Sequence, residues 1–209
     1  MAIAVAEARK NNPAATRQAI LDAATTLFAE RGVGRTSLAH IAKLAGVTKS
    51  LIHHHFGSKS ELWAAVRELG MREYFEAQQK ILQSRPADGQ LFADSIDTYF
   101  RFLQERPQLV RLMAWMAVDP ECDKALQAEK VLRLGIERID SAKKQGLVRD
   151  EIDAMSAILS FLGTIERWFV QREMFHGQLS EEEAKQLDER FVQTLKHIYL
   201  HGLAAPESP

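Results

Sequence analysis

The sequence predicts an all-α protein, and three observations support this fold class. Apolar residues recur at spacings of three and four along most of the chain, as they do on one face of a helix. Glycines and prolines fall mostly between these periodic segments. No run of residues shows the alternating β-branched pattern of a strand. Together these features predict about nine helices joined by short loops.

The composition limits the class of protein further. The chain has 209 residues, of which 46% are hydrophobic and 26% charged, as in folded globular proteins. Its single cysteine, Cys122, excludes an internal disulfide. The longest apolar run, from Leu112 to Val118, is far shorter than the roughly 20 residues that span a bilayer. No basic region precedes the short apolar start, so we expect a cytosolic protein without a signal peptide or a membrane partner.

The first four helices are predicted from their end signals. Asn12 and Pro13 cap and open a helix that Gly32 and Gly34 end, and its apolar face repeats with helical spacing: Ile20, Ala24, Leu27 and Phe28. Thr36 and Ser37 open a short helix that reaches Ala45. After the Gly46-Val47 turn, Thr48 caps a second short helix that ends near Phe56. Ser58 and Glu61 form a capping box for a longer helix that runs to about Ser84.

The remaining helices are predicted from the same kinds of end signal. We expect helices over residues 90–105 and 107–118, and a long one capped by Asp119-Pro120 that Gly146 ends. Asp150 and Asp153 open a helix that reaches His176. Ser180 and Glu183 form the capping box of the last helix, which ends before Gly202.

Residues 36–56 have the length of a helix-turn-helix and the expected glycine-containing turn between two short helices. In this motif the second helix enters the major groove of DNA. Its predicted interior is small and apolar: Leu38, Ile41, Ala42, Ala45, Val47 and Ile52. The exposed face of its second helix then carries side chains that form hydrogen bonds: Thr48, Lys49, Ser50, His53 and His54. Isolated helices this short are marginal in water, so both must pack on the first helix.

The charge distribution also indicates a polyanion partner for the first quarter of the chain. The net charge is −1, but residues 1–60 hold eight Lys and Arg against three Asp and Glu. The remainder is acidic. A basic first quarter on an acidic body favours binding of nucleic acid by the first quarter.

The segment from Thr16 to Leu62 resembles the DNA-binding domain of the TetR family of bacterial transcriptional regulators. The matching features are a first helix that ends in FAERG, the core T-S-L-x-x-I-A-x-x-A-G-V and the closing H-F-G-S-K-S-E-L. The resemblance implies an all-α homodimer that binds operator DNA, with a variable C-terminal domain that binds a small molecule and releases the DNA. We expect residues 12–58 to form the DNA-binding domain and residues 59–202 the effector-binding and dimerisation domain.

The same resemblance assigns roles to residues at matching positions. Thr36 is expected to meet a phosphate with its hydroxyl group at the start of its helix. Thr48, Lys49 and Ser50 open the helix that contacts bases or backbone, together with His53 and His54. His53 stands where the family often has a tyrosine, and which of these residues read bases is left open. Lys59 matches a lysine that contacts phosphate.

Three consecutive histidines, His53 to His55, raise the possibility of a metal site. Consecutive helical residues point about 100° apart, so the three cannot converge on one ion. No Cys-x-x-Cys or His-Glu-x-x-His motif accompanies them. We therefore expect no metal and no cofactor, with His55 packed beside Phe56.

The C-terminal part supplies candidate interfaces and a candidate ligand site. Apolar residues from Ile152 to Phe169 cover about half of their helix, and Ala184 to Ile198 repeat on a narrower stripe. These two helices are expected to pair with their symmetry mates in a homodimer, although each could instead pack on its own subunit. Aromatic and methionine residues are candidates for the ligand site, with core packing as the alternative: Phe92, Tyr99, Phe102, Met113, Trp115, Met116 and Trp168.

Two further possibilities concern the ligand and the function. Arg106 and Arg111 either orient an acidic ligand or remain solvated. An adaptor of the same fold that stays on DNA without an effector is the main alternative function. An enzyme has little support, because the sequence has no Gly-x-Ser-x-Gly motif and no phosphate-binding loop, so no catalytic residue is predicted.

Overall fold

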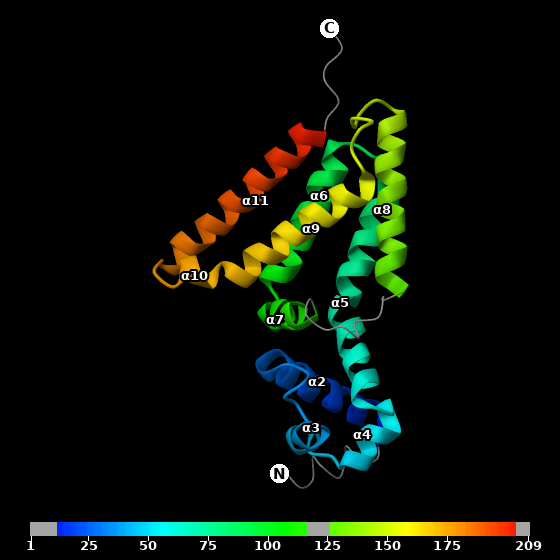
Figure 1. Ribbon diagram of the computed structural model, residues 1–209, viewed down its shortest axis with the longest axis vertical. Coiled ribbons are helices and arrows are strands. Elements are labelled where there is room, and N and C mark those ends of the chain that lie inside the picture. The colour runs from blue at the N-terminus through cyan, green and yellow to red at the C-terminus, as the bar shows by residue number, and fades with distance from the viewer. Residues whose placement is uncertain (1–11, 117–125, 204–209) are drawn as a thin grey trace. The chain divides into compact units, whose positions relative to one another are not determined.

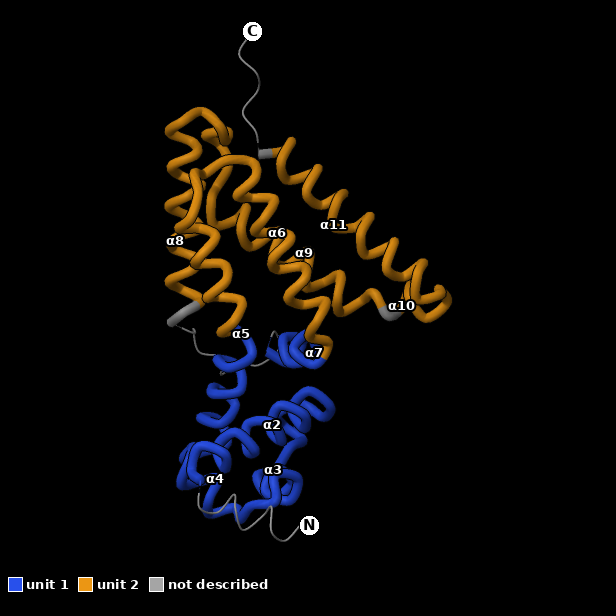
Figure 2. The backbone as a smooth tube through the Cα atoms, turned by 180° about the vertical axis from the view of Figure 1, so that it is seen from behind, with its two compact units in different colours: residues 1–71, 108–123 blue, residues 72–107, 124–209 orange. Residues whose placement is uncertain are grey.

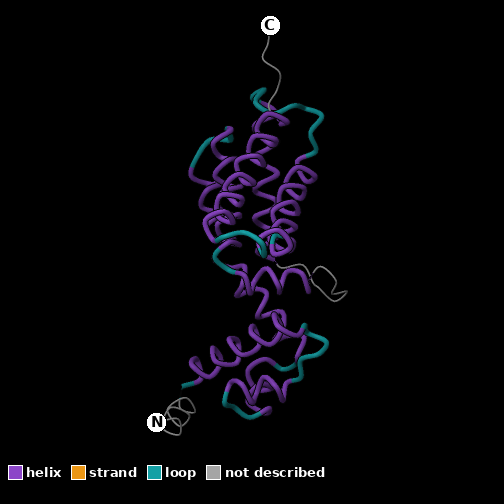
Figure 3. The backbone as a smooth tube through the Cα atoms, turned by 90° about the vertical axis from the view of Figure 1, so that its left-hand side faces the viewer, coloured by secondary structure: helices purple, strands orange, loops and turns teal. Residues whose placement is uncertain are grey.

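The computed structural model describes residues 12–116 and 126–203, and in this part of the chain it contains ten helices and no strand (Figures 1 and 3). The predicted all-α class is therefore confirmed. The chain divides into two compact units, residues 1–71 with 108–123 and residues 72–107 with 124–209 (Figure 2). Cys122 and the predicted Asp119-Pro120 cap lie outside the described residues. Across the described ranges, no helix has the length and apolar character needed to cross a membrane.

The first unit contains the predicted helix-turn-helix. Its helices are α2 (Pro13–Arg31), α3 (Leu38–Ala45), α4 (Lys49–Phe56), the first part of α5 (Lys59–Ser84) and most of α7 (Pro107–Met116). The predicted caps of α2 and α4 form: Asn12 Oδ1 accepts a hydrogen bond from the Ala15 amide at 3.1 Å, and Thr48 Oγ1 accepts from the Leu51 amide at 3.3 Å. Gly46 ends α3 in the left-handed conformation, with φ at 68°.

The core of this unit forms where the sequence predicts it, except that Val47 is only half-buried. The apolar face of α2 is buried, as are Leu38, Ile41, Ala42, Ala45 and Ile52 of the two short helices. Phe28 packs edge-on against Trp63 of α5, with 5.3 Å between ring centroids. The two short helices thus obtain from α2 and α5 the apolar support that they lack alone.

Helix α7 packs closely on the end of α2 within the same unit. Gly32 has φ at 76° and ψ at 162°, a conformation that favours glycine. A Cβ atom added at Gly32 would lie 3.1 Å from the indole ring of Trp115. This position therefore needs glycine both for its backbone conformation and for the space that the indole occupies.

The second unit contains the end of α5 and five further helices. These are α6 (Gly89–Gln104), α8 (Leu126–Lys144), α9 (Ala154–Gln171), α10 (Glu173–His176) and α11 (Glu181–Leu203). The helix predicted to open with Asp150 and Asp153 forms from the Asp153 cap, but its predicted end at His176 is wrong. The helix begins after Asp153, whose carboxylate caps it by accepting from the Ser156 amide at 2.8 Å. It ends at Gln171, and α10 is a separate turn.

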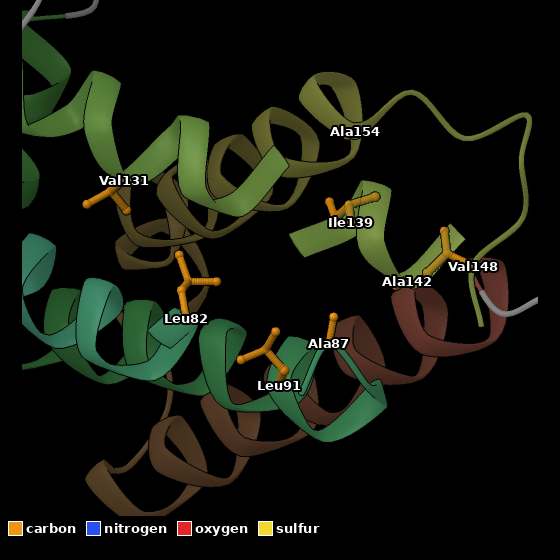
Figure 4. Close-up of a cluster of buried hydrophobic side chains, with 8 residues drawn as sticks. All are labelled: Leu82, Ala87, Leu91, Val131, Ile139, Ala142, Val148 and Ala154. Carbon is orange, nitrogen blue, oxygen red and sulfur yellow. The ribbon is translucent and has the colours of Figure 1, made fainter. Parts of the chain in front are cut away.

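The core of the second unit lies between α5, α6, α8 and α9 (Figure 4). Its buried members are mostly aliphatic and come from these helices and the loops between them: Leu82, Ala87, Leu91, Val131, Ile139, Ala142, Val148 and Ala154. Aromatic residues such as Phe75 and Phe92 pack against this cluster from its edge. The cluster therefore holds four helices around a common apolar interior.

Part of the apolar surface of α9 and α11 stays exposed in the single chain. Ile165 and Phe169 of α9 are buried, as is Leu195 of α11. Several other large apolar side chains on the two helices and on α10 face solvent: Met155, Leu159, Val170, Met174, Phe175 and Ile198. The wide apolar arc that the sequence predicts for α9 is thus only half covered by its own chain.

Candidate functional site

Helix α4 presents a polar face on the surface of the first unit. Ile52 and Phe56 are buried, which turns the opposite side of this helix toward solvent. Thr48, Lys49, Ser50, His53 and His54 are exposed there, as the sequence predicts. A single short helix with this many hydrogen-bonding groups on one face suits the major groove of DNA, which admits one α-helix.

The backbone directly after α4 orients the His53 ring. Its Nδ1 atom lies 2.7 Å from the carbonyl oxygen of Gly57. Because a carbonyl oxygen only accepts, Nδ1 carries a proton and donates it. The other ring nitrogen, Nε2, is then an acceptor in the neutral ring and a donor in the protonated ring. The exposed imidazole is thus held in one orientation with Nε2 free of that contact.

Thr48 and Ser50 hydrogen-bond to each other at the start of α4. Their hydroxyl oxygens lie 3.0 Å apart, while Thr48 Oγ1 also accepts from the Leu51 amide. Both side chains are exposed at the N-terminal end of the helix, next to Lys49. A phosphate at this position would meet the positive end of the helix dipole and two hydroxyl groups.

Thr36 requires a correction. The structure buries it, with 1% of the residue exposed, and its hydroxyl group points to the carbonyl oxygens of Gly32 at 2.9 Å and Leu27 at 3.2 Å. This side chain therefore holds the loop after α2 rather than facing a phosphate. The neighbouring Ser37 is exposed and caps α3, accepting from the His40 amide at 3.2 Å. The sequence prediction names Ser37 with Thr36 at the start of this helix but assigns the phosphate contact to Thr36 alone.

Lys59 has a structural contact inside the first unit. Its ammonium group donates to the carbonyl oxygens of Val33 at 2.9 Å and Thr36 at 3.1 Å. This contact ties the loop between α2 and α3 to the start of α5. An ammonium group has three protons, so these two bonds leave one for another acceptor. The phosphate contact predicted for Lys59 stays a prediction.

The histidines are arranged for packing and surface contact. His55 is half-buried beside Phe56, with 6.3 Å between their ring centroids. His54 and His55 meet edge to face at 5.4 Å. In residues 12–116 and 126–203, no three His, Cys, Asp or Glu side chains gather as a metal site would require.

The second unit holds an apolar cavity of about 220 Å³. Its wall is formed by side chains of α5, α6, α8, α9 and α11, including Leu82, Val131 and Ile139 of the buried cluster (Figure 4). Polar groups enter this wall at Gln78 and Ser95. A mostly apolar wall with a few placed polar groups is typical of a small-molecule site.

The predicted ligand residues of α6 lie at or behind this wall. Phe92 lines the cavity. Tyr99 and Phe102 are buried against Tyr74, with ring centroids 4.7 and 5.5 Å away, and Tyr74 in turn lines the cavity. These two rings therefore support the wall from behind, as the core-packing alternative expects.

The side chain of Trp168 packs and forms a hydrogen bond within the second unit. Its ring stacks on Phe191 at 4.1 Å, and its Nε1 donates to Asp188 at 2.7 Å. Asp188 is buried and also accepts from Arg172 at 2.7 Å and Gln104 at 3.2 Å. This network joins α11 to α9 and α6. Because the indole donates its only N–H proton to Asp188, none remains for a ligand.

The predicted ligand residues of α7 belong to the first unit. Met113, Trp115 and Met116 all lie in the part of α7 that is grouped with α2, and Trp115 packs on Gly32 there. The ligand role of these residues stays a prediction. The sequence reasoning missed Gln78 and Ser95. Gln78 was detectable as a polar residue between Tyr74 and Leu82 on the buried stripe of α5.

A hydrogen bond joins α6 to α9 behind the cavity wall. The Tyr99 hydroxyl group donates to Glu166 Oε1 at 2.6 Å. Burial raises the pKa of the Glu166 carboxyl, although the hydrogen bond from Tyr99 acts in the opposite direction. Burial and the nearby Glu166 carboxylate both raise the pKa of Tyr74 and of Tyr99, so both phenols stay protonated at neutral pH.

Comparison with known proteins gives matches to both parts of the chain. A family model described as bacterial regulatory proteins of the tetR family matches residues 20–66. A second, described as a tetracyclin repressor-like C-terminal domain, matches residues 93–195. The first match contains α3 and α4 entirely, and the second contains most of the helices around the cavity.

Individual relatives agree with these matches. The transcriptional regulator AcrR of Shigella flexneri is 40% identical over 84 residues, which span 40% of this chain and only 39% of that protein. A transcriptional repressor of Streptomyces coelicolor is 26% identical over 76% of this chain and 80% of its own length. Among solved structures, the regulator FadR from Bacillus subtilis in complex with stearoyl-CoA has a TM-score of 0.67 at 18% identity, covering 89% of this chain and 98% of its own.

Proposed function

Because this chain belongs to the TetR family and is a DNA-binding transcriptional regulator, we propose that it is a homodimeric repressor that a small molecule releases from its operator. We assign DNA binding to residues 12–58, and ligand binding and dimerisation to residues 59–202. Regulators of this family are not enzymes, in line with the sequence expectation.

The exposed face of α4 supports the assignment of the reading residues. Lys49, His53 and His54 project from a helix whose opposite side is packed on the core of the unit. Base edges are read by donors and acceptors in the major groove, whereas phosphate contacts set the register. We assign base reading to Lys49, His53 and His54, and phosphate contact to Thr48, Ser50 and the third proton of Lys59.

The apolar cavity of the second unit is the observation that carries the proposal of ligand control. The cavity of about 220 Å³ has a mostly apolar wall and reaches the surface, because Leu159 in this wall is exposed, so a small molecule has both room and access. A solved structure of the same fold, FadR from Bacillus subtilis, is a complex with stearoyl-CoA, which supports small-molecule binding by a protein of this fold. A ligand that binds one conformation better shifts the protein toward that conformation.

Dimerisation is supported by the apolar side chains that α9 and α11 leave exposed. Met155, Leu159 and Ile198 face solvent in the single chain. Two-fold pairing of these helices with their symmetry mates would remove this surface from water. The dimer would then present two reading helices to one face of the DNA. Because the two helices are related by two-fold symmetry, the operator should be roughly palindromic.

The experiment that tests ligand control compares two variants that add the same ring. Ala157 lines the cavity, whereas Ala77 is exposed on α5. Compounds are first screened for release of operator DNA from the wild-type protein by fluorescence anisotropy. A releasing compound should lose at least about tenfold in potency on Ala157→Phe, where the ring fills the cavity, and keep its potency on Ala77→Phe. Equal potency on all three proteins would contradict the cavity as the site.

A further inference from the structure

The wall of the cavity in the second unit carries no charged side chain among the residues that the structure describes there. Its polar groups belong to two tyrosines, one glutamine and one serine: Tyr74, Tyr199, Gln78 and Ser95. Moving an ion from water into such a site without a partner costs far more than moving a neutral group. The wall therefore disfavours an anionic or cationic ligand.

Two cationic side chains near the cavity helices form ion pairs. Arg106 binds Glu73 at 2.6 Å and Glu105 at 3.1 Å. Lys196 binds Asp97 at 3.0 Å. An acidic ligand that took Arg106 or Lys196 as its counter-ion would have to break one of these pairs, so Arg106 does not support the acidic ligand that the sequence left open.

The amide of Gln78 is held in one orientation by Ser95. The Ser95 hydroxyl group donates its only proton to the carbonyl oxygen of Leu91, at 2.9 Å. It can therefore only accept from Gln78, whose Nε2 lies 2.8 Å away. This arrangement leaves the other amide atom, Oε1, as the acceptor that Ser95 does not use.

Gln78 Oε1 has no hydrogen-bond partner in the described part of the protein. The residue is 5% exposed, so water does not replace the missing partner at the surface. A buried acceptor without a donor costs free energy, because it has lost its hydrogen bonds to water. A ligand that brings a donor to this atom would recover that free energy.

We propose that the cavity binds an uncharged, mainly apolar ligand with one hydrogen-bond donor, and that Gln78 selects it by accepting this hydrogen bond. The inference rests on the proposed function for the claim that the cavity is the effector site. It adds the chemical class of the effector and names the residue that determines specificity.

The test uses four compounds that share a propylbenzene body, with binding to the wild-type protein measured by isothermal titration calorimetry at pH 7 without DNA. The compounds are 4-propylphenol, propylbenzene, 4-propylbenzoate and 4-propylbenzylamine. The phenol is neutral at this pH, the benzoate is an anion and the benzylamine a cation. We expect the phenol to bind most tightly, and each ion at least about a hundredfold more weakly. Tighter binding of either ion than of the phenol would overturn the proposal.

A variant pair then tests the role of Gln78. Gln78→Met keeps the shape of the side chain and removes the acceptor. Gln83→Met makes the same change at an exposed glutamine of α5 that does not line the cavity. The affinity ratio of 4-propylphenol to propylbenzene should fall about tenfold in Gln78→Met and persist in Gln83→Met. An unchanged ratio in Gln78→Met would overturn the role of Gln78, and the wild-type ranking remains decisive if that variant does not fold.

Failure of this inference can be told apart from failure of ligand control. Phenol binding in the predicted rank order, with no release of operator DNA, would sustain the ligand class and contradict ligand control. Release by 4-propylbenzoate at lower concentrations than by 4-propylphenol would sustain ligand control and contradict the ligand class.

Discussion

Lys59 shows how one side chain can serve the fold and the DNA contact together. Its bonds to Val33 and Thr36 close the loop between α2 and α3. We expect Lys59→Met to lower the free energy of unfolding by about 1–3 kcal/mol, because two carbonyl oxygens lose a charged donor. Urea denaturation measures this change. Lys43→Met removes an exposed lysine of α3 and should change stability by no more than about 0.5 kcal/mol.

The phosphate contact of Lys59 has a separate signature. If its third proton reaches a phosphate, Lys59→Met weakens binding to all DNA sequences about equally and lowers the salt slope by about one. Stability equal to that of the wild type would contradict the loop contact. An unchanged salt slope in a folded variant would contradict the phosphate contact.

Glu166 predicts a specific pH dependence of stability. Because burial raises its pKa in the folded chain, its contribution to stability is fully present below the unfolded pKa and is lost as the pH rises through the folded pKa. Glu166→Gln resembles the protonated carboxyl at every pH. We therefore expect its free energy of unfolding to match the wild type in acid and to exceed it increasingly toward neutral pH, by urea denaturation across a pH series.

Glu183 provides the control of opposite sign. Its hydrogen bonds with Ser180 lower its pKa, so its contribution is present above the unfolded pKa and is lost as the pH falls through the folded pKa. The free energy of unfolding of Glu183→Gln should thus fall below that of the wild type as the pH rises from acid. A difference between Glu166→Gln and the wild type that is constant with pH would contradict the assignment for Glu166.

The contacts of single side chains also show the limit of what the sequence could predict. The exposed positions on α4 follow from its two buried residues, Ile52 and Phe56, and were predicted correctly. Thr36 and Ser37 are adjacent hydroxyl residues at one helix start, and a pattern cannot say which of them caps and which is buried. The orientation of the Gln78 amide depends on Ser95, which lies 17 positions further along the chain, so the sequence pattern around Gln78 does not indicate it.

At the scale of elements, the contact of α7 with the end of α2 gives a direct prediction. Gly32→Ala forces a non-glycine residue into a strained conformation and places its methyl group 3.1 Å from the Trp115 ring. We expect it to lower the free energy of unfolding by about 1–3 kcal/mol in urea denaturation. Gly34→Ala is the matched control, because a Cβ atom there meets nothing within 4 Å. Equal stability of the two variants would contradict the account of this contact.

Helix boundaries were predictable wherever a capping side chain sets them. Asn12, Thr48, Asp153 and the Ser180–Glu183 pair all form the expected caps. The break between α9 and α10 has no such local signal. It lies at Arg172, whose side chain binds Asp188 of α11, and a contact between separate helices is invisible to sequence periodicity.

At the scale of the whole molecule, dimerisation depends on the apolar face that α9 and α11 leave open. Ile198 is 58% exposed in the single chain, and Leu44 of α3 is 54% exposed. We expect Ile198→Glu to shift the protein from dimer to monomer at micromolar concentration, because it would bury an unpaired charge in the interface. Sedimentation velocity measures this shift. Leu44→Glu adds the same charge elsewhere and should remain dimeric, and a dimeric Ile198→Glu protein would contradict the proposed interface.

Sequence reading by α4 can be tested in one binding experiment. Fluorescence anisotropy compares DNA from upstream of the protein's own gene with a scrambled duplex across a salt series, for the wild type and for His53→Ala. We predict a preference of about a thousandfold or more for the wild type, affinity that falls as salt rises, and a preference that shrinks in His53→Ala. Equal affinity of the wild type for both duplexes at every salt concentration would contradict sequence reading by α4.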